Sequence, residues 1–367
     1  MNIEIRFSEL SVLEKDAVFT ADAVIGNLST DTRSIMKGDT YLAIRGEHHD
    51  GHEFIDQAVS SGASSLVVSS AINTAVPSIK VKDTVVSLGN IAKIYRNKLP
   101  AKIIGITGSN GKTTVKEMVT SICRECSEVT ATLRNNNNKV GVPLTLLSAS
   151  RSDDYVVVEI GTSEQGEIAY LSNIVEPDVS IITTISESHL AGIGSRDDVF
   201  REKSAIIPMT RKAGSVIINN DCEYASQLRK MVDGSSVITY GLQGDVDVGG
   251  SFRSIDKGLQ VTAKTPVGEL SYILSVPGSH NVSNSFAAIA ISCSLGISNE
   301  KIVMGLEKFS GIKGRLQVKQ LFSSVSLIDD SYNAYPASTK VALDVLSDSE
   351  GRKIFVFGGM AELGEQE

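Results

Sequence analysis

The stretch with the clearest chemical meaning runs from 102 to 117 and reads KIIGITGSNGKTTVKE. Its β-branched first half predicts a buried strand, its glycines predict a loop, and helix-forming sequence resumes at Lys112. A strand, a glycine-rich loop and a helix in this order form a phosphate cradle, because loop amides and the helix N-terminus attract an anion. Lys112 would reach the β- and γ-phosphates of a nucleotide, and the Thr113 hydroxyl would hold Mg²⁺. The expected ATP-binding residues of this stretch are Gly108, Ser109, Asn110, Gly111, Lys112, Thr113 and Thr114.

The loop departs from the common phosphate-loop pattern G-x-x-x-x-G-K-[ST]. That pattern would place glycine at position 106, where this chain has Ile106. The alternative is a glycine-rich strand-to-helix turn with an incidental lysine. The order of strand, loop, Lys-Thr pair and helix favours the phosphate site.

Two further polar residues follow apolar strands. Glu159 lies near the end of a predicted strand over 155–160, and His189 follows a predicted strand over 179–185. Because ligands bind at the carboxyl ends of parallel strands, we expect Thr113, Glu159 and His189 near one crevice. A carboxylate on an apolar strand is costly unless it is paired or binds a cation, so Glu159 is a candidate Mg²⁺ ligand. A paired structural carboxylate and a hydrogen-bonded structural histidine are the alternatives.

Other polar positions are weaker signals. Lys203 lies on a predicted helix over 196–207 and, taken alone, is an ordinary solvated lysine. Asn281 and Asn284 lie three apart, hence on one helix face, as caps or as an edge that recognises a base. Cys123 and Cys126 form a C-x-x-C without a second pair at zinc spacing, and we interpret them as core-side helix residues.

The elements that must position these residues alternate between strands and helices. This alternation predicts an α/β fold with a small domain over 1–100, a central domain with a mostly parallel sheet over 101–312, and a further α/β unit over 313–367. That last unit has about half of a typical domain's residues, so we expect it to be truncated. Further expected elements are strands at 40–44, 66–70, 325–328 and 353–357, helices at 52–61, 279–295 and 337–346, and β-hairpins over 245–276.

Composition narrows the class of protein. The chain of 367 residues is 41% hydrophobic and 21% charged, as expected of an ordinary globular protein. Its net charge of -8, with no basic block, argues against a nucleic-acid partner. Residues 1–20 mix charges into every apolar run, and no uncharged apolar run reaches membrane-spanning length. These features and four cysteines without a secretory signal predict a cytoplasmic protein with reduced thiols.

Several motifs together resemble the ATP-dependent Mur ligases of peptidoglycan synthesis, and also folylpolyglutamate synthetase, which shares their core. The match runs in order along essentially the whole chain, so the joint pattern is specific. Besides the phosphate loop, the matching stretches are Asn135-x-Asn137-Asn138-x-x-Gly141-x-Pro143, Glu159-Ile160-Gly161, His189-Leu190 followed by Lys203, Gly278-x-His280-Asn281-x-x-Asn284, Gly314-Arg315 and 329–334 (DDSYNA). The resemblance implies a three-domain architecture with a central P-loop domain and a Rossmann-like C-terminal domain.

Within the family, the loops Asp31-Thr32-Arg33 and 46–52 resemble the UDP-binding domain of the enzymes that add the third residue and the terminal dipeptide. The stretch 329–334 favours the second of these enzymes. The resemblance therefore implies that ATP phosphorylates the terminal carboxylate of UDP-N-acetylmuramoyl-tripeptide, and that the amine of D-alanyl-D-alanine attacks the acyl phosphate. The implied substrate-binding residues are Thr32, Arg33, Gly46, Asn137 and Asn138.

By the same resemblance, the cofactors are ATP and Mg²⁺; separately, we expect a monomer. Asn281 would contact adenine, Arg315 the γ-phosphate and Asp330 the ribose. Thr113 and Glu159 would hold one Mg²⁺, and His189 would help to hold a second. Lys203 is the position that carries a carbamate in this family, which would replace a cation near the metals by a negative group. The implied catalytic residues are Lys112, Lys203, His189 and Arg315.

Other interpretations remain open at this stage. The nearest is another amide ligase of the superfamily, which adds either the third peptide residue or glutamate to folate; the UDP-type loops argue against the folate enzyme. A nucleotide-gated binding protein without ligase chemistry would keep the phosphate loop but would not need Glu159, His189, Lys203 and Arg315 together. A small-molecule kinase would accumulate a phosphorylated product without any amine.

Overall fold

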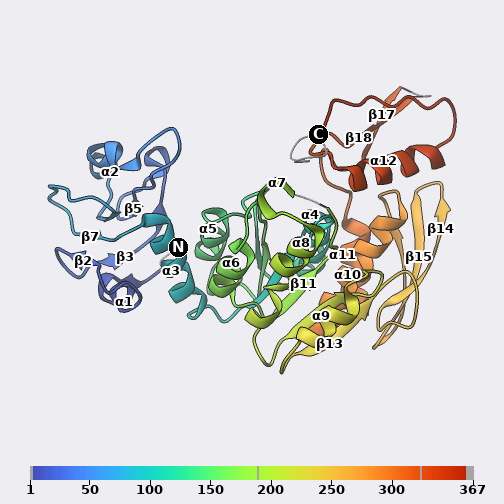
Figure 1. The fold of residues 1–367 in the computed structure, drawn as a ribbon, viewed down its shortest axis with the longest axis horizontal. Helices are drawn as coiled ribbons and strands as arrows, with labels where there is room; N and C mark the ends of the chain where they lie inside the picture. The colour runs from blue at the N-terminus through green and yellow to red at the C-terminus, as the bar shows by residue number, and fades with distance from the viewer. Residues whose placement is uncertain (1–2, 188–189, 323–324, 361–367) are drawn as a thin grey trace. The chain divides into compact units, whose positions relative to one another are not determined.

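The computed structural model describes residues 3–187, 190–322 and 325–360 (Figure 1). The chain divides into two compact units. The N-terminal unit contains residues 1–101, 132–153 and 173–175, and the second unit contains the rest. The mixed α/β class expected from the sequence is confirmed.

A five-stranded sheet with the order β2-β7-β6-β5-β4 forms the centre of the N-terminal unit. All its neighbouring strands are parallel except β2, which pairs with β7 in the antiparallel sense. The apolar residues of β5 and β6 pack with α2, and Tyr41, Ala58 and Leu66 lie in this core. The elements of residues 1–101 are β1 (Ile5–Arg6), α1 (Phe7–Leu13), β2 (Val18–Phe19), β3 (Val24–Ile25), β4 (Leu28–Ser29), η1 (Thr32–Ser34), β5 (Thr40–Leu42), η2 (Gly51–Phe54), α2 (Ile55–Ser60), β6 (Ser65–Val68), β7 (Ser78–Lys80) and α3 (Thr84–Arg96).

Helix α5 (Gly141–Ser148) also belongs to the N-terminal unit, whereas the sequence placed it in the central domain. Long-range hydrogen bonds from α3 explain this grouping. The Tyr95 hydroxyl donates to the Ala149 carbonyl at 2.8 Å, and Arg96 Nε donates to the Val175 carbonyl at 2.9 Å. The chain therefore crosses back to the first unit after the boundary near residue 100.

The second unit contains a six-stranded, all-parallel sheet with the order β13-β12-β11-β8-β10-β9. Its inner strands are runs of buried β-branched residues, as expected for a parallel sheet covered on both faces. The strands are β8 (Lys102–Thr107), β9 (Val129–Ala131), β10 (Tyr155–Glu159), β11 (Val179–Ile182), β12 (Ser215–Asn219) and β13 (Ser236–Tyr240).

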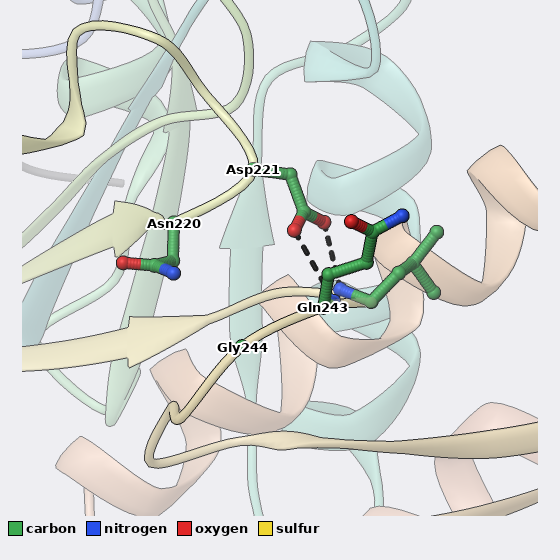
Figure 2. Close-up of a pocket in the computed structure, with 5 residues that line it drawn as sticks. Asn220, Asp221, Gln243 and Gly244 are labelled. Carbon is green, nitrogen blue, oxygen red and sulfur yellow. Dashed lines mark hydrogen bonds between the residues drawn. The ribbon is translucent and has the colours of Figure 1, made fainter.

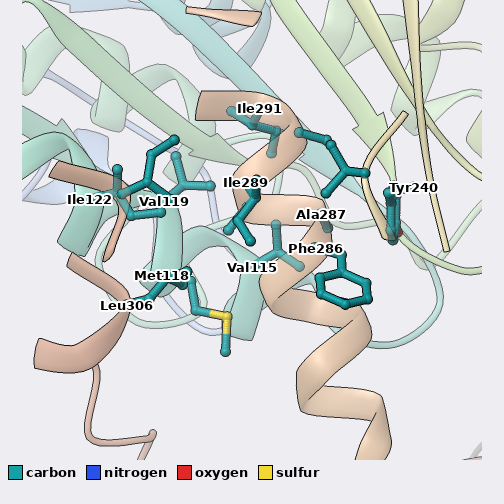
Figure 3. Close-up of a cluster of buried hydrophobic side chains, with 14 of the residues drawn as sticks. Val115, Met118, Val119, Ile122, Tyr240, Phe286, Ala287, Ile289, Ile291 and Leu306 are labelled. Atoms are coloured by element: carbon teal, nitrogen blue, oxygen red, sulfur yellow. The ribbon is translucent and has the colours of Figure 1, made fainter. Parts of the chain in front are cut away.

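Apolar faces of α4, α10 and α11 meet in one core of this unit. Val115, Met118 and Ile122 of α4 lie in one buried cluster with Phe286 and Ile289 of α10 and Leu306 of α11 (Figure 3). The helix that follows β8 is thereby held against a second helix. The helices of the second unit are α4 (Lys112–Arg124), α6 (Glu167–Val175, which runs into the first unit), α7 (Leu190–Ile193), α8 (Arg196–Ser204), η3 (Ile207–Met209), α9 (Ala225–Met231), α10 (Ser279–Ser294), α11 (Asn299–Lys308) and α12 (Pro336–Asp348).

The hairpins predicted over 245–276 form a three-stranded antiparallel sheet of β14 (Gly249–Ile255), β15 (Gly258–Thr265) and β16 (Gly268–Leu274). β17 (Gln317–Phe322) and β18 (Val325–Asp329) pair further along the chain. The strand predicted over 353–357 is wrong. Its apolar residues favour a strand locally, but a strand needs a hydrogen-bonded neighbour, and within the described residues this segment pairs with none.

The C-x-x-C pair divides between core and surface. Cys123 is buried, as predicted, and burial raises the pKa of its thiol to about 12. Cys126 is exposed, so its interpretation as a core-side residue is wrong. Burial of part of its side chain still raises the pKa of the Cys126 thiol, so both thiols lack the lowered pKa of a reactive cysteine. In the parts of the chain that are described, no helix is long and apolar enough to cross a membrane.

Candidate active site

The predicted phosphate cradle forms between β8 and α4. Gly108 and Gly111 both have positive φ angles, +145° and +82°, which favour glycine. A Cβ at Gly108 would collide with the Thr183 hydroxyl, and one at Gly111 would come within 2.6 Å of Asn284 Oδ1. Only glycine therefore fits at these two positions of the loop.

The segment after β11 braces this loop. The Ser109 amide donates to the Thr184 carbonyl at 2.8 Å, and the Asn110 amide donates to the Thr184 hydroxyl at 2.9 Å. The Ser109 hydroxyl donates to the Ser186 carbonyl at 2.9 Å. The edge formed by the carboxyl ends of β8 and β11 thus holds the loop in one conformation.

Lys112, Glu159 and Lys203 come together beside the cradle. Lys112 Nζ donates to the Gly108 carbonyl at 2.7 Å, folding back over its own loop. The pKa of Lys112 is lowered overall. Desolvation is the main cause and Arg315 adds to it, whereas the Glu159 carboxylate opposes the shift. Glu159 and Lys203 are 2% and 1% exposed, respectively. Desolvation holds the pKa of Lys203 well below that of a free lysine, and the positive charge of Lys112 lowers it further. A solvated Lys203 is therefore wrong, and burial favours the neutral amine over its charged form.

Glu202, the neighbour of Lys203 on α8, is also buried. Its carboxylate accepts from the Gly166 amide at 2.6 Å and from the Ile168 amide at 2.7 Å, which satisfies the N-terminus of α6. A buried carboxylate with these bonds fixes the rotation of α8 about its axis. This anchoring directs Lys203 toward Lys112.

The two asparagines of α10 lie on one face, as predicted. Asn284 Nδ2 donates to Asn281 Oδ1 at 3.3 Å, and Asn281 Nδ2 donates to the Pro277 carbonyl at 2.7 Å. Asn284 touches the cradle at Gly111, so this face of α10 borders the phosphate loop. Beside it, burial lowers the pKa of His280 to about 4, which keeps its ring neutral at neutral pH.

Arg315 lies between α11 and β17, where the chain enters the β17–β18 hairpin, and Asp330 directly follows β18, where the chain leaves it. The Arg315 guanidinium stacks over the Tyr332 ring at 4.2 Å from its centroid. Asp330 accepts from the Leu316 amide at 3.0 Å, and desolvation raises its pKa. Arg315 interacts electrostatically with both Lys112 and Asp330 and so belongs to the same cluster of charges.

His189 lies outside the described residues. Among the residues that are described, no group of three His, Cys, Asp or Glu side chains is arranged to hold a metal ion. The buried oxygens of Thr113 and Glu159 beside the cradle nevertheless suit Mg²⁺, which binds through one or two carboxylates together with nucleotide phosphates. The donor set at the cradle therefore fits a magnesium nucleotide.

The predicted UDP-binding residues lie at an edge of the N-terminal unit's sheet. Thr32 and Arg33 form η1 directly after β4, where Asp31 accepts from the Arg33 amide at 3.0 Å. Arg33 also donates to Asp31 from Nε at 2.9 Å, and its side chain is 86% exposed. Gly46 follows β5 and donates its amide to the His49 carbonyl.

Asn137 and Asn138 lie ahead of α5 in the same unit. Asn138 Oδ1 accepts from the amides of Val140 and Gly141 at 3.1 and 2.9 Å. These bonds satisfy donors at the start of a helix, so Asn138 has a structural function beyond the substrate contact implied by the resemblance.

An open hollow of about 560 Å³ lies at the carboxyl ends of β12 and β13 (Figure 2). Its wall includes Asp221, whose carboxylate accepts from the amides of Leu242 and Gln243 at 2.7 and 3.2 Å. This acid is therefore used to join two loops.

Sequence reasoning missed three groups of residues near the sites. One group, Thr183, Thr184 and Ser186, braces the phosphate loop. Hydroxyl residues are common in and after strands, so their side chains gave no signal in the sequence. Glu202 caps a helix that lies far from it in the sequence. The Asp50–His52 pair, joined at 2.6 Å, was visible only as a polar loop.

Comparison with known proteins identifies the family. Residues 24–105 match the model for the Mur ligase family catalytic domain, and residues 106–292 match that for the Mur ligase middle domain. UDP-N-acetylmuramoyl-tripeptide--D-alanyl-D-alanine ligase of Escherichia coli (strain K12) is 34% identical over 366 residues, which cover 99% of this chain and 81% of that protein.

Solved structures agree with this match. A crystal structure of MurF from Acinetobacter baumannii superposes with a TM-score of 0.92 at 33% identity, covering 99% of this chain and 81% of that one. MurF ligase from Thermotoga maritima in complex with ADP superposes with a TM-score of 0.84 at 25% identity, covering 93% and 79%. With these relatives and the phosphate cradle in place, the chain belongs to the Mur ligase family.

Proposed function

We infer that this chain is an ATP-dependent ligase that adds D-alanyl-D-alanine to UDP-N-acetylmuramoyl-tripeptide in peptidoglycan precursor synthesis. The cluster of Lys112, Glu159, Lys203 and Arg315 around a phosphate cradle is the observation that carries the proposal. A protein that only binds a nucleotide has no need to bury Lys203 beside Lys112. The names of the relatives supply the identity of acceptor and amine.

The reaction divides into two transfers. The terminal carboxylate of the tripeptide attacks the γ-phosphorus of ATP, the bond to ADP breaks, and an acyl phosphate forms. The amine of D-alanyl-D-alanine then attacks the acyl carbon, loses a proton, and displaces inorganic phosphate to leave an amide. Charge neutralisation and positioning provide most of the catalysis in such transfers.

We assign Lys112 to the β- and γ-phosphates and Arg315 to the γ-phosphate. Both are cations that interact electrostatically at the cradle. The other residues of the loop, from Gly108 to Thr114, would contact the phosphates of ATP through backbone amides and side-chain hydroxyls. Asn281 would face adenine and Asp330 the ribose, since both lie in the segments that border the cradle.

Mg²⁺ would be held by Thr113 and Glu159, with His189 and a modified Lys203 at a second metal, and it would neutralise charge on the phosphates. The lowered pKa of Lys203 supports a carbamate, because a neutral amine can add to carbon dioxide, forming an N–C bond and releasing a proton. The carbamate would present an oxygen anion where a protonated lysine would repel Lys112 and the metal.

Thr32, Arg33 and Gly46 would contact the UDP part of the acceptor, and Asn137 and Asn138 the remainder. These residues all belong to the N-terminal unit. We propose a monomer that works in the cytoplasm, where ATP and nucleotide-linked precursors are available.

Phosphate release tests this function. The protein is incubated with ATP, Mg²⁺ and UDP-N-acetylmuramoyl-tripeptide, with and without D-alanyl-D-alanine. We expect phosphate release that depends on D-alanyl-D-alanine. We also expect a product that is heavier than the acceptor by two alanine residues. Phosphate release that does not depend on D-alanyl-D-alanine, but requires a diamino acid together with the UDP-linked acceptor that carries only a dipeptide, would assign the chain to the preceding ligation step.

A further inference from the structure

The segment 45–51, which leads from the loop after β5 into η2, is closed by its own backbone. Arg45 and Asp50 pair as an isolated antiparallel bridge, and the Gly51 amide donates to the Ile44 carbonyl at 2.8 Å. Gly51 lies directly on the Ile44 backbone, where a Cβ would come within 2.8 Å of the Ile44 nitrogen. This backbone leaves the loop little freedom.

A chain of side-chain bonds ties the same loop to the sheet. The Ser69 amide, just after β6, donates to His52 Nε2 at 2.9 Å. His52 Nδ1 lies 2.6 Å from Asp50 Oδ1, and Arg45 Nε donates to Asp50 Oδ2 at 2.8 Å. Because Nε2 accepts from an amide, the ring proton resides on Nδ1 and points at Asp50. The imidazole is therefore locked in one tautomer between a strand end and the loop.

Acid, imidazole and serine also occur in this order in hydrolase triads, but this geometry excludes a hydrolase. The Ser69 hydroxyl lies 3.3 Å from Nε2, whereas the Ser69 amide already occupies that nitrogen at the shorter distance. A general base needs this lone pair for the hydroxyl proton. The chain of bonds therefore positions the groups it joins.

The group at its outer end is the Arg45 guanidinium. The exposed fraction rises along the chain, from 10% for His52 through 28% for Asp50 to 64% for Arg45. Among the described residues, the hydrogen bonds of the Arg45 side chain use only Nε, which leaves four N–H donors of the fork for a ligand. A planar guanidinium with its orientation fixed is suited to bind phosphate through two parallel bonds.

The surroundings of Arg45 connect it with the predicted UDP-binding loop. The Tyr41 hydroxyl donates to the Gly51 carbonyl at 2.9 Å and interacts electrostatically with both Asp31 and Asp50. The loops after β4 and β5 therefore share one edge of the parallel sheet, where ligands of α/β proteins bind.

We propose that the Ser69–His52–Asp50 chain is a positioning device that presents the Arg45 guanidinium to the diphosphate of the UDP-linked substrate. The identity of this ligand rests on the proposed function. His52 does not touch the ligand; it acts through Asp50 and Arg45.

Titration calorimetry with UDP as the probe tests the proposal on the whole chain. We expect Arg45→Ala to weaken UDP binding at least about tenfold, the usual effect of losing a hydrogen bond to a charged group. His52→Ala should weaken it by a similar factor. His52→Asn keeps a donor at the Nδ1 position and should retain most of the affinity, whereas His52→Gln keeps only the acceptor toward Ser69 and should not.

Lys15→Ala, on an exposed side chain of the N-terminal unit outside both UDP-binding loops, serves as the control, and the melting temperature of each variant is measured in parallel. Wild-type affinity in His52→Ala would overturn the inference, as would an equal loss in His52→Asn and His52→Gln that follows their melting temperatures. Failure of the wild-type protein to bind UDP would instead overturn the proposed substrate.

Discussion

The N-terminal unit's mostly parallel sheet and the all-parallel sheet of the second unit differ in how exposed the charges at their carboxyl edges are. In the N-terminal unit, Arg33 and Arg45 are 86% and 64% exposed, and each is held by a carboxylate from its own loop. In the second unit, Glu159 and Lys203 are 2% and 1% exposed, and Lys203 lies within the field of another lysine. The charges at the carboxyl edge are thus solvated in the N-terminal unit's sheet and desolvated in the second unit's sheet.

The difference suggests a division of work. Exposed ion pairs contribute little to stability but orient a guanidinium for recognition. Buried like charges oppose folding, and such arrangements are typical of sites where chemistry requires them. We therefore interpret the first edge as a recognition surface and the second as the site of phosphoryl transfer.

The largest expected effect comes from removing the positive charge of Lys112, at the carboxyl edge of the second unit's sheet. Lys112→Ala should lower the rate of phosphate release at least about 10²–10³-fold, because a charge that stabilises the transferring phosphoryl group is lost. The rate is measured with saturating substrates. Lys257→Ala, on an exposed turn, is the matched control. A loss of less than tenfold in Lys112→Ala would argue against the assigned cradle.

Lys203→Met should separate activity from stability. Activity should fall by about 10²-fold if the proposed carbamate is needed, while the free energy of unfolding at neutral pH should rise by on the order of 1 kcal/mol, because a desolvated amine is removed. Thermal unfolding and phosphate release measure the two effects. A destabilised variant would show that Lys203 is a structural residue.

The same lysine predicts a pH dependence. Between its lowered pKa and the ordinary lysine value of 10.5, the unfolded chain holds a proton that the folded chain does not. Stability from this group therefore rises with pH across that range. Lys203→Met should flatten the rise in denaturant titrations at several pH values, and an unchanged slope would contradict the assignment.

A smaller effect is expected at the glycine turn of the cradle. Gly111→Ala places a side chain at a φ of +82° and against Asn284, so we expect a loss of about 1–2 kcal/mol in stability. ATP binding should weaken as well. Gly351→Ala, also at positive φ but with no atom within 4 Å of its Cβ, separates backbone strain from the collision.

The smallest structural effect should come from the exposed edge. Arg33→Ala should leave the melting temperature unchanged, because the pair with Asp31 is solvated. The KM for the UDP-linked acceptor should nevertheless rise by about tenfold, with the KM for ATP unchanged. A lowered melting temperature with an unchanged KM would reverse the interpretation of this edge.

The sequence predicted features that depend on local order. Gly108, Gly111 and Lys112 lie in one continuous stretch, so their spacing alone indicates the cradle. The strand that ends at Glu159 was likewise predicted from a continuous run of apolar residues, and β10 ends at Glu159.

Features that depend on distant partners could not be predicted. The amides capped by Glu202 lie more than thirty positions away, and the bond from Ser69 to His52 joins the end of β6 to η2. The strand expected over 353–357 failed for the same reason. Its composition favours extended backbone, but pairing depends on a neighbour that composition does not supply.

The most direct test of the division of work measures two ligands on two variants. Calorimetry gives the affinity of UDP and of ATP for Lys112→Ala and for Arg45→Ala, with the wild-type protein as reference. We expect Lys112→Ala to lose affinity only for ATP and Arg45→Ala to lose affinity only for UDP. If either substitution weakens both ligands to the same extent, the two edges do not divide recognition from phosphoryl transfer.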